Sequence, residues 1–367
     1  MLIKYYSGTT VEHEMLGNVL RSFYGDDSKV RDLLCMFVMN SLLGDYSGVM
    51  NRQQSMIYRF QTTPLPDSQS HNLTFDQCCL RRAEEIWQQC QDRPVIVFWS
   101  GGIDSTALLT ALIATNDDWQ KKLVIYTSHY AVEHEYPWFW DKYLKKLPVC
   151  FLVNQDFNQA EIYQQDALIL TGYCADQLWG NSILKQFDHN GLVHWREFFQ
   201  QPWFIQKTPA HLKTLVISYI EQQVNLFPRP INTMIDLAWM LVFVHTWDHV
   251  CRRPMARIPS LDLLDKLTHF YNTQDFQIWA MNNPQARVWR EYRENKQVAK
   301  DFIYRLTKDN HYRIHKCKEQ SMTYCCDDES LRSYWRLITD HGARSRLDPA
   351  DHIAGRSEEH TSELQSH

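Results

Sequence analysis

The sequence contains ten cysteines but no C-x-x-C pair, and it has no long apolar run. The cysteine spacing therefore matches neither a zinc ribbon nor a secreted disulfide framework. The longest apolar run, Leu237–Val244, is far shorter than the ~20 residues needed to span a bilayer. Residues Met1–Tyr6 lack the apolar block of a signal peptide. These absences predict a cytoplasmic protein with reduced thiols and no membrane partner.

The sequence also has no excess of basic residues over acidic ones, and it has few glycines. The formal net charge is −5 at pH 7, so no basic excess indicates a nucleic-acid surface, and we expect no nucleic-acid partner. Only 12 of the 367 residues are glycine, which makes a pair of adjacent glycines informative. Apolar residues make up 44% and charged residues 22%, a mix that excludes a mostly disordered chain. The length suits one large domain or two, with a core that needs no metal or disulfide.

The N-terminal part of the chain differs from the middle. Apolar residues at helical spacing predict helices near 12–25 and 28–43, and the proline-bearing stretch Pro64–Ser70 predicts a linker. We therefore expect residues 1–70 to form a small, mostly helical region and residues 71–340 to form the main domain.

The last residues have a separate explanation. Arg356–Ser366 (RSEEHTSELQS) resembles the in-frame translation of a sequencing-library adapter. An ordinary polar tail is the alternative. On the adapter interpretation, residues 356–367 are not native sequence, and the fold is predicted without them.

The main domain shows alternating strand and helix signals. A capped helix, with Thr74 or Asn72 at its start, runs to about Gln91. Short apolar runs then alternate with helical stretches: strand Val95–Trp99, helix Ile103–Thr115, strand Leu123–Tyr126, a helix near 136–146, and strands Val149–Val153 and Leu168–Thr171. From about residue 193 the pattern is mostly helical, with helices at Ile235–Val250 and Gln297–Leu306. This predicts an α/β fold with a parallel sheet and a mostly helical C-terminal lobe, and such sheets bind ligands beyond the carboxyl ends of their strands.

The clearest chemical signal is the hexapeptide S-G-G-I-D-S at residues 100–105, between a predicted strand and its helix. Gly101 and Gly102 let the backbone turn sharply, so that N–H groups of the turn and of the helix start point at an anion. Asp104 would repel a phosphate unless a divalent cation lay between them, which predicts Mg²⁺. A tight strand-to-helix turn with incidental serines is the alternative. The predicted phosphate-binding residues are Ser100, Gly101, Gly102, Asp104 and Ser105.

This hexapeptide resembles the pyrophosphate loop (PP-loop) of the N-type ATP pyrophosphatases, which cleave ATP between its α- and β-phosphates. The resemblance implies an adenine nucleotide α-hydrolase-like (HUP) fold. A second block, residues 170–180 (LTGYCADQLWG), resembles the asparagine synthetase segment G-E-G-[AS]-D-E-[LV]-F-G, with matches at Gly172, Ala175, Asp176, Leu178 and Gly180. The resemblance implies that Gly172 contacts the nucleotide and that Asp104 and Asp176 bind Mg²⁺.

The second block departs from the family pattern at three positions. Tyr173 stands where Glu is usual, Cys174 replaces Gly, and Gln177 replaces the second Glu. Because the first Glu of the asparagine synthetases is implicated in handling the substrate, an aspartate substrate is in doubt. The related β-lactam synthetases use a Tyr in a base dyad, which makes Tyr173 a candidate base or substrate contact, with pocket lining as the alternative.

Two lysines follow in weaker, collinear blocks. Residues 270–284 resemble the family stretch that begins P-F-L-D, with Arg257–Asp262 as an alternative match. Lys296 opens a helix that resembles the K-x-x-L-R-E helix of the family, and the resemblance makes it a candidate catalytic residue. Lys318, with Lys316 as its neighbour, lies in a stretch resembling the K-E-Q segment that supplies a catalytic lysine. A cation there would stabilise charge on the departing pyrophosphate, although a solvated charge cluster is the alternative.

The resemblance spans roughly residues 74–325 and implies an ATP-dependent, AMP-forming carbon–nitrogen ligase. A carboxylate would be adenylated with release of pyrophosphate and then joined to an amine. Leu2 stands where an N-terminal glutaminase has its cysteine, and residues 1–70 are too few for that domain. We therefore expect ammonia, another amine or a separate glutaminase as the nitrogen source. The alternatives are a β-lactam synthetase-like ligase with a non-aspartate substrate and a non-catalytic nucleotide-binding module.

Overall fold

The computed structural model describes residues 3–6, 65–66, 73–152, 160–180, 184, 191–201, 210–252, 266–289, 291–317, 335–338 and 344–347. The helices expected near 12–25 and 28–43, and residues 356–367, lie outside these ranges. The chain divides into two compact units. Unit 1 comprises Met1–Ser68, Gly180–Ala256 and Ser330–His367, and unit 2 comprises Gln69–Trp179 and Arg257–Glu329.

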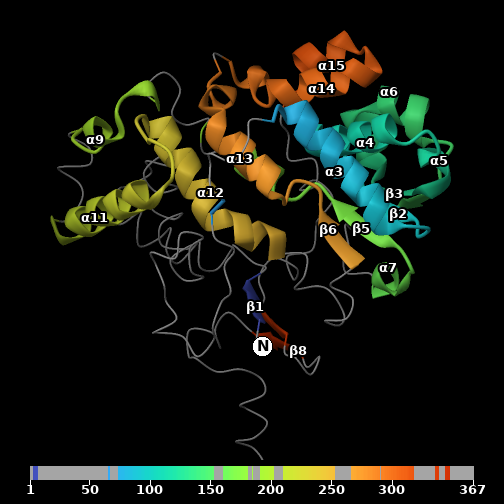
Figure 1. The fold of residues 1–367 in the computed structure, drawn as a ribbon, viewed down its shortest axis with the longest axis horizontal. Coiled ribbons are helices and arrows are strands. Elements are labelled where there is room, and N and C mark those ends of the chain that lie inside the picture. Colours follow the sequence, from blue (N-terminus) through green and yellow to red (C-terminus); the bar gives the residue numbers. More distant parts are fainter. Residues whose placement is uncertain are drawn as a thin grey trace, which may run out of the picture. The chain divides into compact units, whose positions relative to one another are not determined.

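Unit 2 is built on a five-stranded sheet (Figure 1). Its strands are β2 (Val95–Phe98), β3 (Leu123–Thr127), β4 (Val149–Phe151), β5 (Leu168–Thr171) and β6 (Leu267–His269). All neighbouring strands are parallel, in the order β4-β3-β2-β5-β6. The predicted α/β class with a parallel sheet is therefore confirmed. β2 and β5 are buried along their whole length, because a central parallel strand is covered on both faces.

Helical elements connect and flank these strands. They are α3 (Phe75–Cys90), α4 (Ile103–Thr115), α5 (Trp119–Lys122), the π-helical turns η2 (Ala131–Glu135) and η3 (Trp140–Leu144), α6 (Pro137–Phe139), α7 (Ala160–Gln164), α8 (Ala175–Trp179), α13 (Gln274–Asn282), the 3₁₀ turns η8 (Pro284–Arg287) and η9 (Tyr292–Glu294), α14 (Gln297–Thr307) and α15 (Asn310–His315). The helices expected at 74–91, 103–115 and 297–306 are thus present as α3, α4 and α14.

The strand order reverses direction between β2 and β5, and this sets apart the carboxyl ends of these two strands. From β2 the chain moves outward through β3 to β4, and it then returns to place β5 on the opposite side of β2. At such a reversal, the loops after the two central strands diverge and leave a crevice at their carboxyl ends, where α/β sheets bind ligands. The loop at residues 100–105 follows β2, and Gly172 follows β5. The topology therefore brings both sequence blocks to the same crevice.

The sequence patterns did not predict strand β6. It has only three residues, and it forms because Thr171 of β5 pairs with His269. A run this short carries no period-2 signal, so only the neighbouring strand determines its conformation. Its consequence for the site is that the residues after β6 reach the same crevice as those after β2 and β5.

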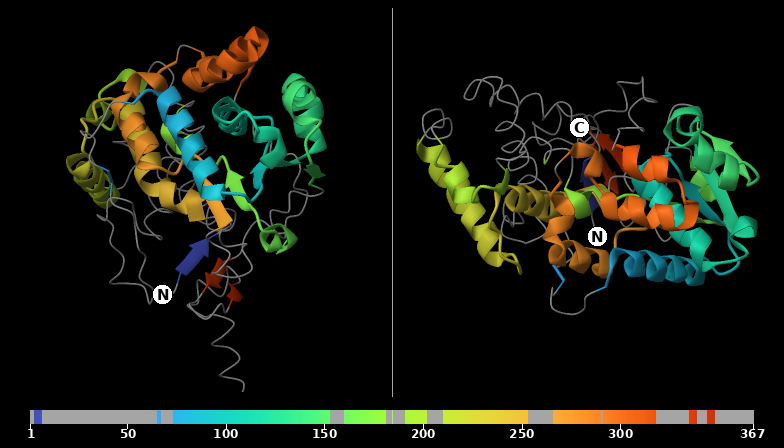
Figure 2. Two further views of the ribbon diagram at one scale, coloured as in Figure 1. Left: turned by 45° about the vertical axis from the view of Figure 1, so that its right-hand side comes forward. Right: turned by 90° about the horizontal axis from the view of Figure 1, so that it is seen from above.

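Helix α4 lies in the core of unit 2. Nine of its thirteen residues are buried, since it packs against α3 and α14 (Figure 2). Helix α3 begins with a capping box in which Gln77 N–H donates to Thr74 Oγ1 and Thr74 N–H donates to Gln77 Oε1. Burial of α4 on all sides explains why its sequence is apolar without a polar face.

Unit 1 contains mostly helices among its described residues. They are α9 (Trp195–Phe198), α11 (Ala210–Leu226) and α12 (Met234–Arg252), with an antiparallel sheet of β1 (Ile3–Tyr6), β7 (Trp335–Ile338) and β8 (Arg344–Leu347) in the order β1-β7-β8. Trp239 and Phe243 of α12 pack with ring centroids 4.9 Å apart. The long apolar run in the sequence is thus a stretch of α12 that is buried on all sides.

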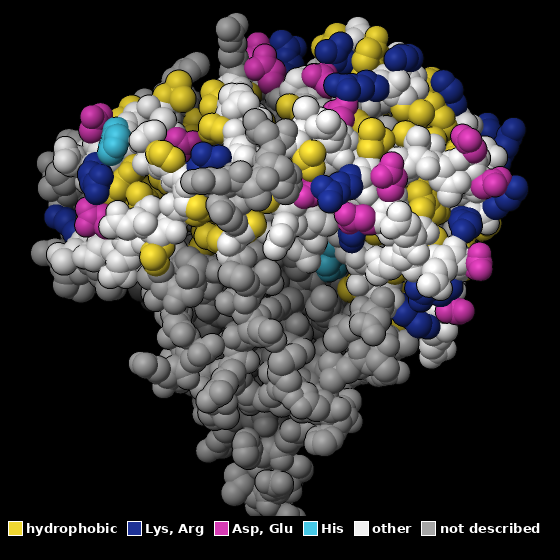
Figure 3. Space-filling model, viewed as in Figure 1, with side chains coloured by type: hydrophobic (Ala, Val, Ile, Leu, Met, Phe, Trp, Pro, Cys, Tyr) yellow, Lys and Arg dark blue, Asp and Glu magenta, His cyan; other side chains and the backbone are white. Residues whose placement is uncertain are grey.

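The described surface carries no single charge sign on the face shown in Figure 3, where basic and acidic side chains are interspersed. No described helix has the length and apolar character required to cross a membrane. Cys78, Cys79, Cys90, Cys150 and Cys317 are free thiols. Cys174 is disulfide-bonded, which differs from the expectation of fully reduced thiols.

The buried position of α4 gives a first testable consequence. Leu109 is fully buried, so Leu109→Ala removes core contacts and is expected to lower the free energy of unfolding by about 2–5 kcal/mol. Val288→Ala is the control, because Val288 is 49% exposed and its loss is expected to cost under about 0.5 kcal/mol. Guanidinium titration followed by tryptophan fluorescence measures both. Equal stability of the two variants would contradict the packing.

Candidate functional site

The loop at residues 100–105 forms a tight turn held by its own hydroxyl groups. Ser100 N–H donates to Ser105 Oγ at 3.2 Å, and Gly102 N–H donates to Ser100 Oγ at 3.3 Å. Gly101 has φ +73°, a conformation that side chains disfavour. A Cβ at Gly101 would lie 2.4 Å from Glu135 Cβ, so glycine is needed there for two independent reasons.

Helix α4 begins directly at this turn. Gly102 is its N-cap residue and supplies no side-chain cap. The first N–H groups of an α-helix have no intrahelical acceptor, and the helix dipole places partial positive charge beside them. A turn of this kind followed by a helix start is the arrangement in which backbone N–H groups bind anions.

The second sequence block packs against the first. A Cβ at Gly172 would lie 3.6 Å from Ser105 N, which shows how closely the chain after β5 passes the start of α4. Cys174, with φ +72°, then turns the chain into α8. Asp176 lies in the first turn of α8 and faces the crevice from the β5 side, whereas Asp104 faces it from the β2 side.

Lys296 joins the two aspartates. Its Nζ lies 2.5 Å from Asp104 Oδ2 and 2.7 Å from Asp176 Oδ1. The Lys296 side chain is only 1% exposed, whereas Asp104 is 26% and Asp176 is 42% exposed. Burial by itself lowers the pKa of Lys296, but the two carboxylates outweigh burial and raise the pKa above its ordinary value. The ammonium group therefore stays charged and holds the two carboxylates together.

The backbone is strained at this place. Lys296 is the N-cap of α14 and has φ +58°, in the left-handed region that non-glycine residues rarely adopt. Such a conformation costs of order 1–3 kcal/mol and persists only where its surroundings enforce it. The same conformation occurs at Lys308, the C-cap of α14, so it does not by itself mark a functional site.

The end of β6 supports both aspartate-bearing segments. Tyr271 O–H donates to the backbone O of Asp104 at 2.8 Å, and burial raises the Tyr271 pKa, so the phenol remains a donor. His269 Nδ1 lies 2.7 Å from Thr171 Oγ1, which accepts a hydrogen bond from Tyr173 N–H at 3.3 Å. The ring of Tyr173 meets the ring of His269 edge to face, at 5.8 Å between centroids. His269 is thus a neighbour of Tyr173 that the sequence did not reveal.

The structure brings most of the predicted site residues together, with one exception. Asp104, Asp176 and Lys296 form one cluster, and the loop residues and Gly172 border it. Lys318, the predicted catalytic lysine, lies outside the described residues. Its neighbour Lys316 forms an ion pair with Glu135, a contact that no sequence signal announced.

The aspartate cluster contains oxygen donors of the type that Mg²⁺ uses. This ion binds through one or two carboxylates together with phosphate oxygens and water. Asp104 and Asp176 meet at a single nitrogen and so provide two converging carboxylates. In the described part of the chain, no three His, Cys, Asp or Glu side chains form a metal-binding group. The two carboxylates supply oxygen donors of the kind that Mg²⁺ binds, and the Lys296 ammonium occupies the point where they converge.

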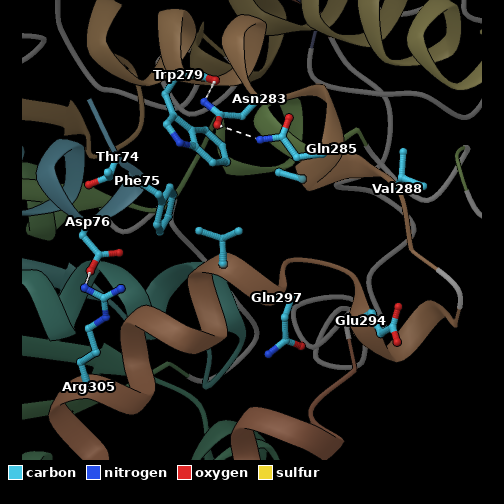
Figure 4. A pocket seen from close by; sticks show the side chains of 12 residues that line it. Thr74, Phe75, Asp76, Trp279, Asn283, Gln285, Val288, Glu294, Gln297 and Arg305 are labelled. Carbon is cyan, nitrogen blue, oxygen red and sulfur yellow. Dashed lines mark hydrogen bonds and ion pairs between the residues drawn. The ribbon is translucent and has the colours of Figure 1, made fainter. Parts of the chain in front are cut away.

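A separate cavity of about 550 Å³ opens elsewhere in unit 2 (Figure 4). It lies between the start of α3, the end of α13 and helix α14, and Phe75 and Trp279 contribute aromatic surface to it. An ion pair between Asp76 and Arg305 lies at its side. None of residues 100–105 lines this cavity, so it does not belong to the aspartate cluster.

Replacement by alanine is expected to affect stability much more at Gly101 than at Gly172. Gly101→Ala is expected to lose at least about 1–2 kcal/mol of stability, because alanine at φ +73° is strained and its Cβ clashes with Glu135. Gly172→Ala is the matched control, since its Cβ would meet neighbours only at 3.6 Å or beyond. Thermal melts of both variants make the comparison. A Gly101→Ala protein as stable as Gly172→Ala would refute the loop conformation.

Removing the shared ammonium should destabilise the protein. Lys296→Met removes the ammonium that joins the two carboxylates, and we expect a loss of about 1–3 kcal/mol, below the value for a fully buried pair because Asp176 is partly exposed. Added Mg²⁺ should restore part of this loss by replacing the missing cation. Lys121→Met, which removes an exposed pair with Asp118, should leave stability unchanged. Denaturant titrations with and without Mg²⁺ provide the measurement, and an unaffected Lys296→Met variant would contradict the cluster.

Comparisons with protein-family models, with curated proteins and with solved structures returned no match.

Proposed function

We propose that this protein is an ATP-dependent, AMP-forming ligase of the asparagine synthetase-like PP-loop type, which adenylates a carboxylate and then forms an amide. One observation carries the proposal. The glycine turn at 100–105 and the carboxylates of Asp104 and Asp176 converge at the reversal point of a parallel sheet, around the ammonium of Lys296. An anion-binding turn beside two carboxylates suits a polyphosphate accompanied by a divalent cation.

In this proposal each part of the cluster has a separate task. The turn and the start of α4 bind the β- and γ-phosphates through backbone N–H groups. Asp104 and Asp176 would hold Mg²⁺, and the ion would supply positive charge beside the departing pyrophosphate. Lys296 holds the two carboxylates close together, with its Nζ 2.5 Å from Asp104 Oδ2 and 2.7 Å from Asp176 Oδ1. Tyr271 holds the first turn of α4 in place through the backbone O of Asp104.

The reaction has two steps. A carboxylate oxygen of the substrate attacks the α-phosphorus of ATP, the bond from that phosphorus to the α,β-bridging oxygen breaks, and pyrophosphate leaves with the electron pair. An amine then attacks the acyl carbon of the adenylate. The carbon–oxygen bond to AMP breaks, the nitrogen loses a proton, and an amide remains. Free ammonia, a second amine or a separate glutaminase subunit supplies the nitrogen in this scheme.

A second candidate function is favoured by the position of Tyr173. A β-lactam synthetase-like ligase closes a ring within one substrate and needs a base to deprotonate the internal nucleophile. Tyr173 follows β5 at the crevice, with His269 edge-on to its ring. A tyrosine can act as a base when a neighbouring group takes up its proton, and the His269 imidazole is one such neighbour. On this alternative the adenylation step is unchanged and only the nucleophile differs.

Isotope exchange between ATP and pyrophosphate tests the proposed adenylation. With Mg²⁺ and a panel of carboxylic acids, the protein is expected to show exchange with at least one acid, because adenylation is reversible. Asp104→Asn and Asp176→Asn should each reduce the exchange rate by 10²-fold or more, on the order expected when charge stabilisation of the leaving group is lost. Asp141→Asn, at an exposed ion pair with Lys145, is the control and should retain the full rate.

Two outcomes would separate the candidates. Tight ATP binding without exchange for any acid would overturn the ligase proposal and favour a non-catalytic nucleotide-binding module. Exchange that survives in Tyr173→Phe, with loss of the overall product, would favour the ring-closing ligase, because the tyrosine would then act only after adenylation.

A further inference from the structure

A buried ion pair lies beside the glycine turn, outside the aspartate cluster. Lys316 directly follows α15, and its Nζ contacts the carboxylate of Glu135, the last residue of η2. Lys316 Nζ also lies 3.3 Å from the backbone O of Glu135. The side chains are 10% and 1% exposed, respectively. A pair so well buried interacts far more strongly than a surface salt bridge.

Glu135 packs directly against the glycine turn. A Cβ built on Gly101 would lie 2.4 Å from Glu135 Cβ and 3.0 Å from the backbone O of Ala131. The acidic residue therefore lies next to the part of the loop that has an anion-binding character. An uncompensated carboxylate in this position would repel a polyphosphate, since little solvent separates the two charges.

The segment that carries Lys316 is anchored to the same turn by aromatic residues. Tyr312 of α15 stacks on Tyr136 with ring centroids 3.8 Å apart, and its O–H lies 3.5 Å from the backbone O of Gly101. Tyr136 O–H in turn donates to Asp309 Oδ2 at 3.1 Å. Burial raises the pKa of Tyr312 well above its usual value, so this phenol remains a hydrogen-bond donor.

A second buried lysine holds Lys316 from the other side. Lys300 is fully buried on α14, one turn after Lys296, and its Nζ donates to the backbone O of Arg293 and, at 3.3 Å, to that of Lys316. Helix α14 thus contributes Lys296 to the aspartate cluster and Lys300 to the Lys316 segment. Both ends of Lys316, its backbone and its ammonium group, are fixed relative to the glycine turn.

From these contacts we infer that Lys316 is a positioning residue of the nucleotide site: it neutralises Glu135 and thereby allows the Gly101 turn to bind polyphosphate. The inference rests on the proposed function, in that the turn must bind a nucleotide. It differs from a direct role, in which Lys316 itself would contact the phosphates. The two roles predict opposite results when Glu135 and Lys316 are changed together.

The test is a double-mutant cycle on ATP affinity. Isothermal titration of the full-length protein with ATP in the presence of Mg²⁺ is applied to Lys316→Met, Glu135→Gln and the double variant. Lys316→Met should weaken ATP binding by 10-fold or more, because it removes the buried cation that is paired with the Glu135 carboxylate beside the turn. The double variant should bind within about threefold of the wild-type protein, because the carboxylate and its partner are removed together.

Two further variants complete the cycle. Lys145→Met, which removes an exposed pair with Asp141, should leave ATP affinity unchanged. Lys316→Arg keeps the charge and should keep most of the affinity, and it takes the place of Lys316→Met should that variant fail to fold. In that event, weak ATP binding by Lys316→Arg would overturn the inference.

The outcomes separate the two levels of the proposal. Wild-type binding of ATP together with a double variant as weak as Lys316→Met would overturn the positioning role and leave the proposed function intact. No ATP binding by the wild-type protein would overturn the proposed function and this inference with it. Restored affinity in the double variant would establish that Lys316 acts through Glu135.

Discussion

One shared ammonium group organises the candidate site. Lys296 is 192 residues from Asp104 and 120 from Asp176 along the chain, yet it forms ion pairs with both. Two carboxylates that converge on one place repel each other, and the crevice at the sheet reversal would be unfavourable without a cation between them. The burial of Lys296 makes this compensation strong, because little water competes for the charges.

Helix α14 extends this organisation to the glycine turn. Two buried lysines lie at its start: Lys296 is the N-cap residue, and Lys300 follows in the first turn. Lys296 reaches the aspartates, while Lys300 holds the backbone of the segment after α15. Two buried tyrosines also hold this region: Tyr312 donates to the backbone O of Gly101, and Tyr271 donates to the backbone O of Asp104. The site is therefore held by charges and phenols from elements that follow the sheet in sequence.

Much of this arrangement was accessible from sequence patterns. The apolar run before S-G-G-I-D-S predicted β2 and the turn, and Thr74 predicted the start of α3. Asp104, Asp176 and Lys296 were all selected from motifs, and they lie together. Glu135 and His269 were missed, because each acts through a partner from a distant part of the chain. β6 was missed for the same reason, since three residues become a strand only beside β5.

The sequence by itself determined the local features: which residues turn, which form buried strands, and where a helix begins. These depend on neighbours within a few positions, namely the paired glycines at 101 and 102, the apolar run of β2 and the capping box at Thr74. Only the tertiary structure decided which charged side chains form ion pairs with one another. It paired Lys316 with Glu135 and placed Lys296 between two aspartates, because ion pairs depend on distance in space and on burial, and neither is encoded in a local pattern.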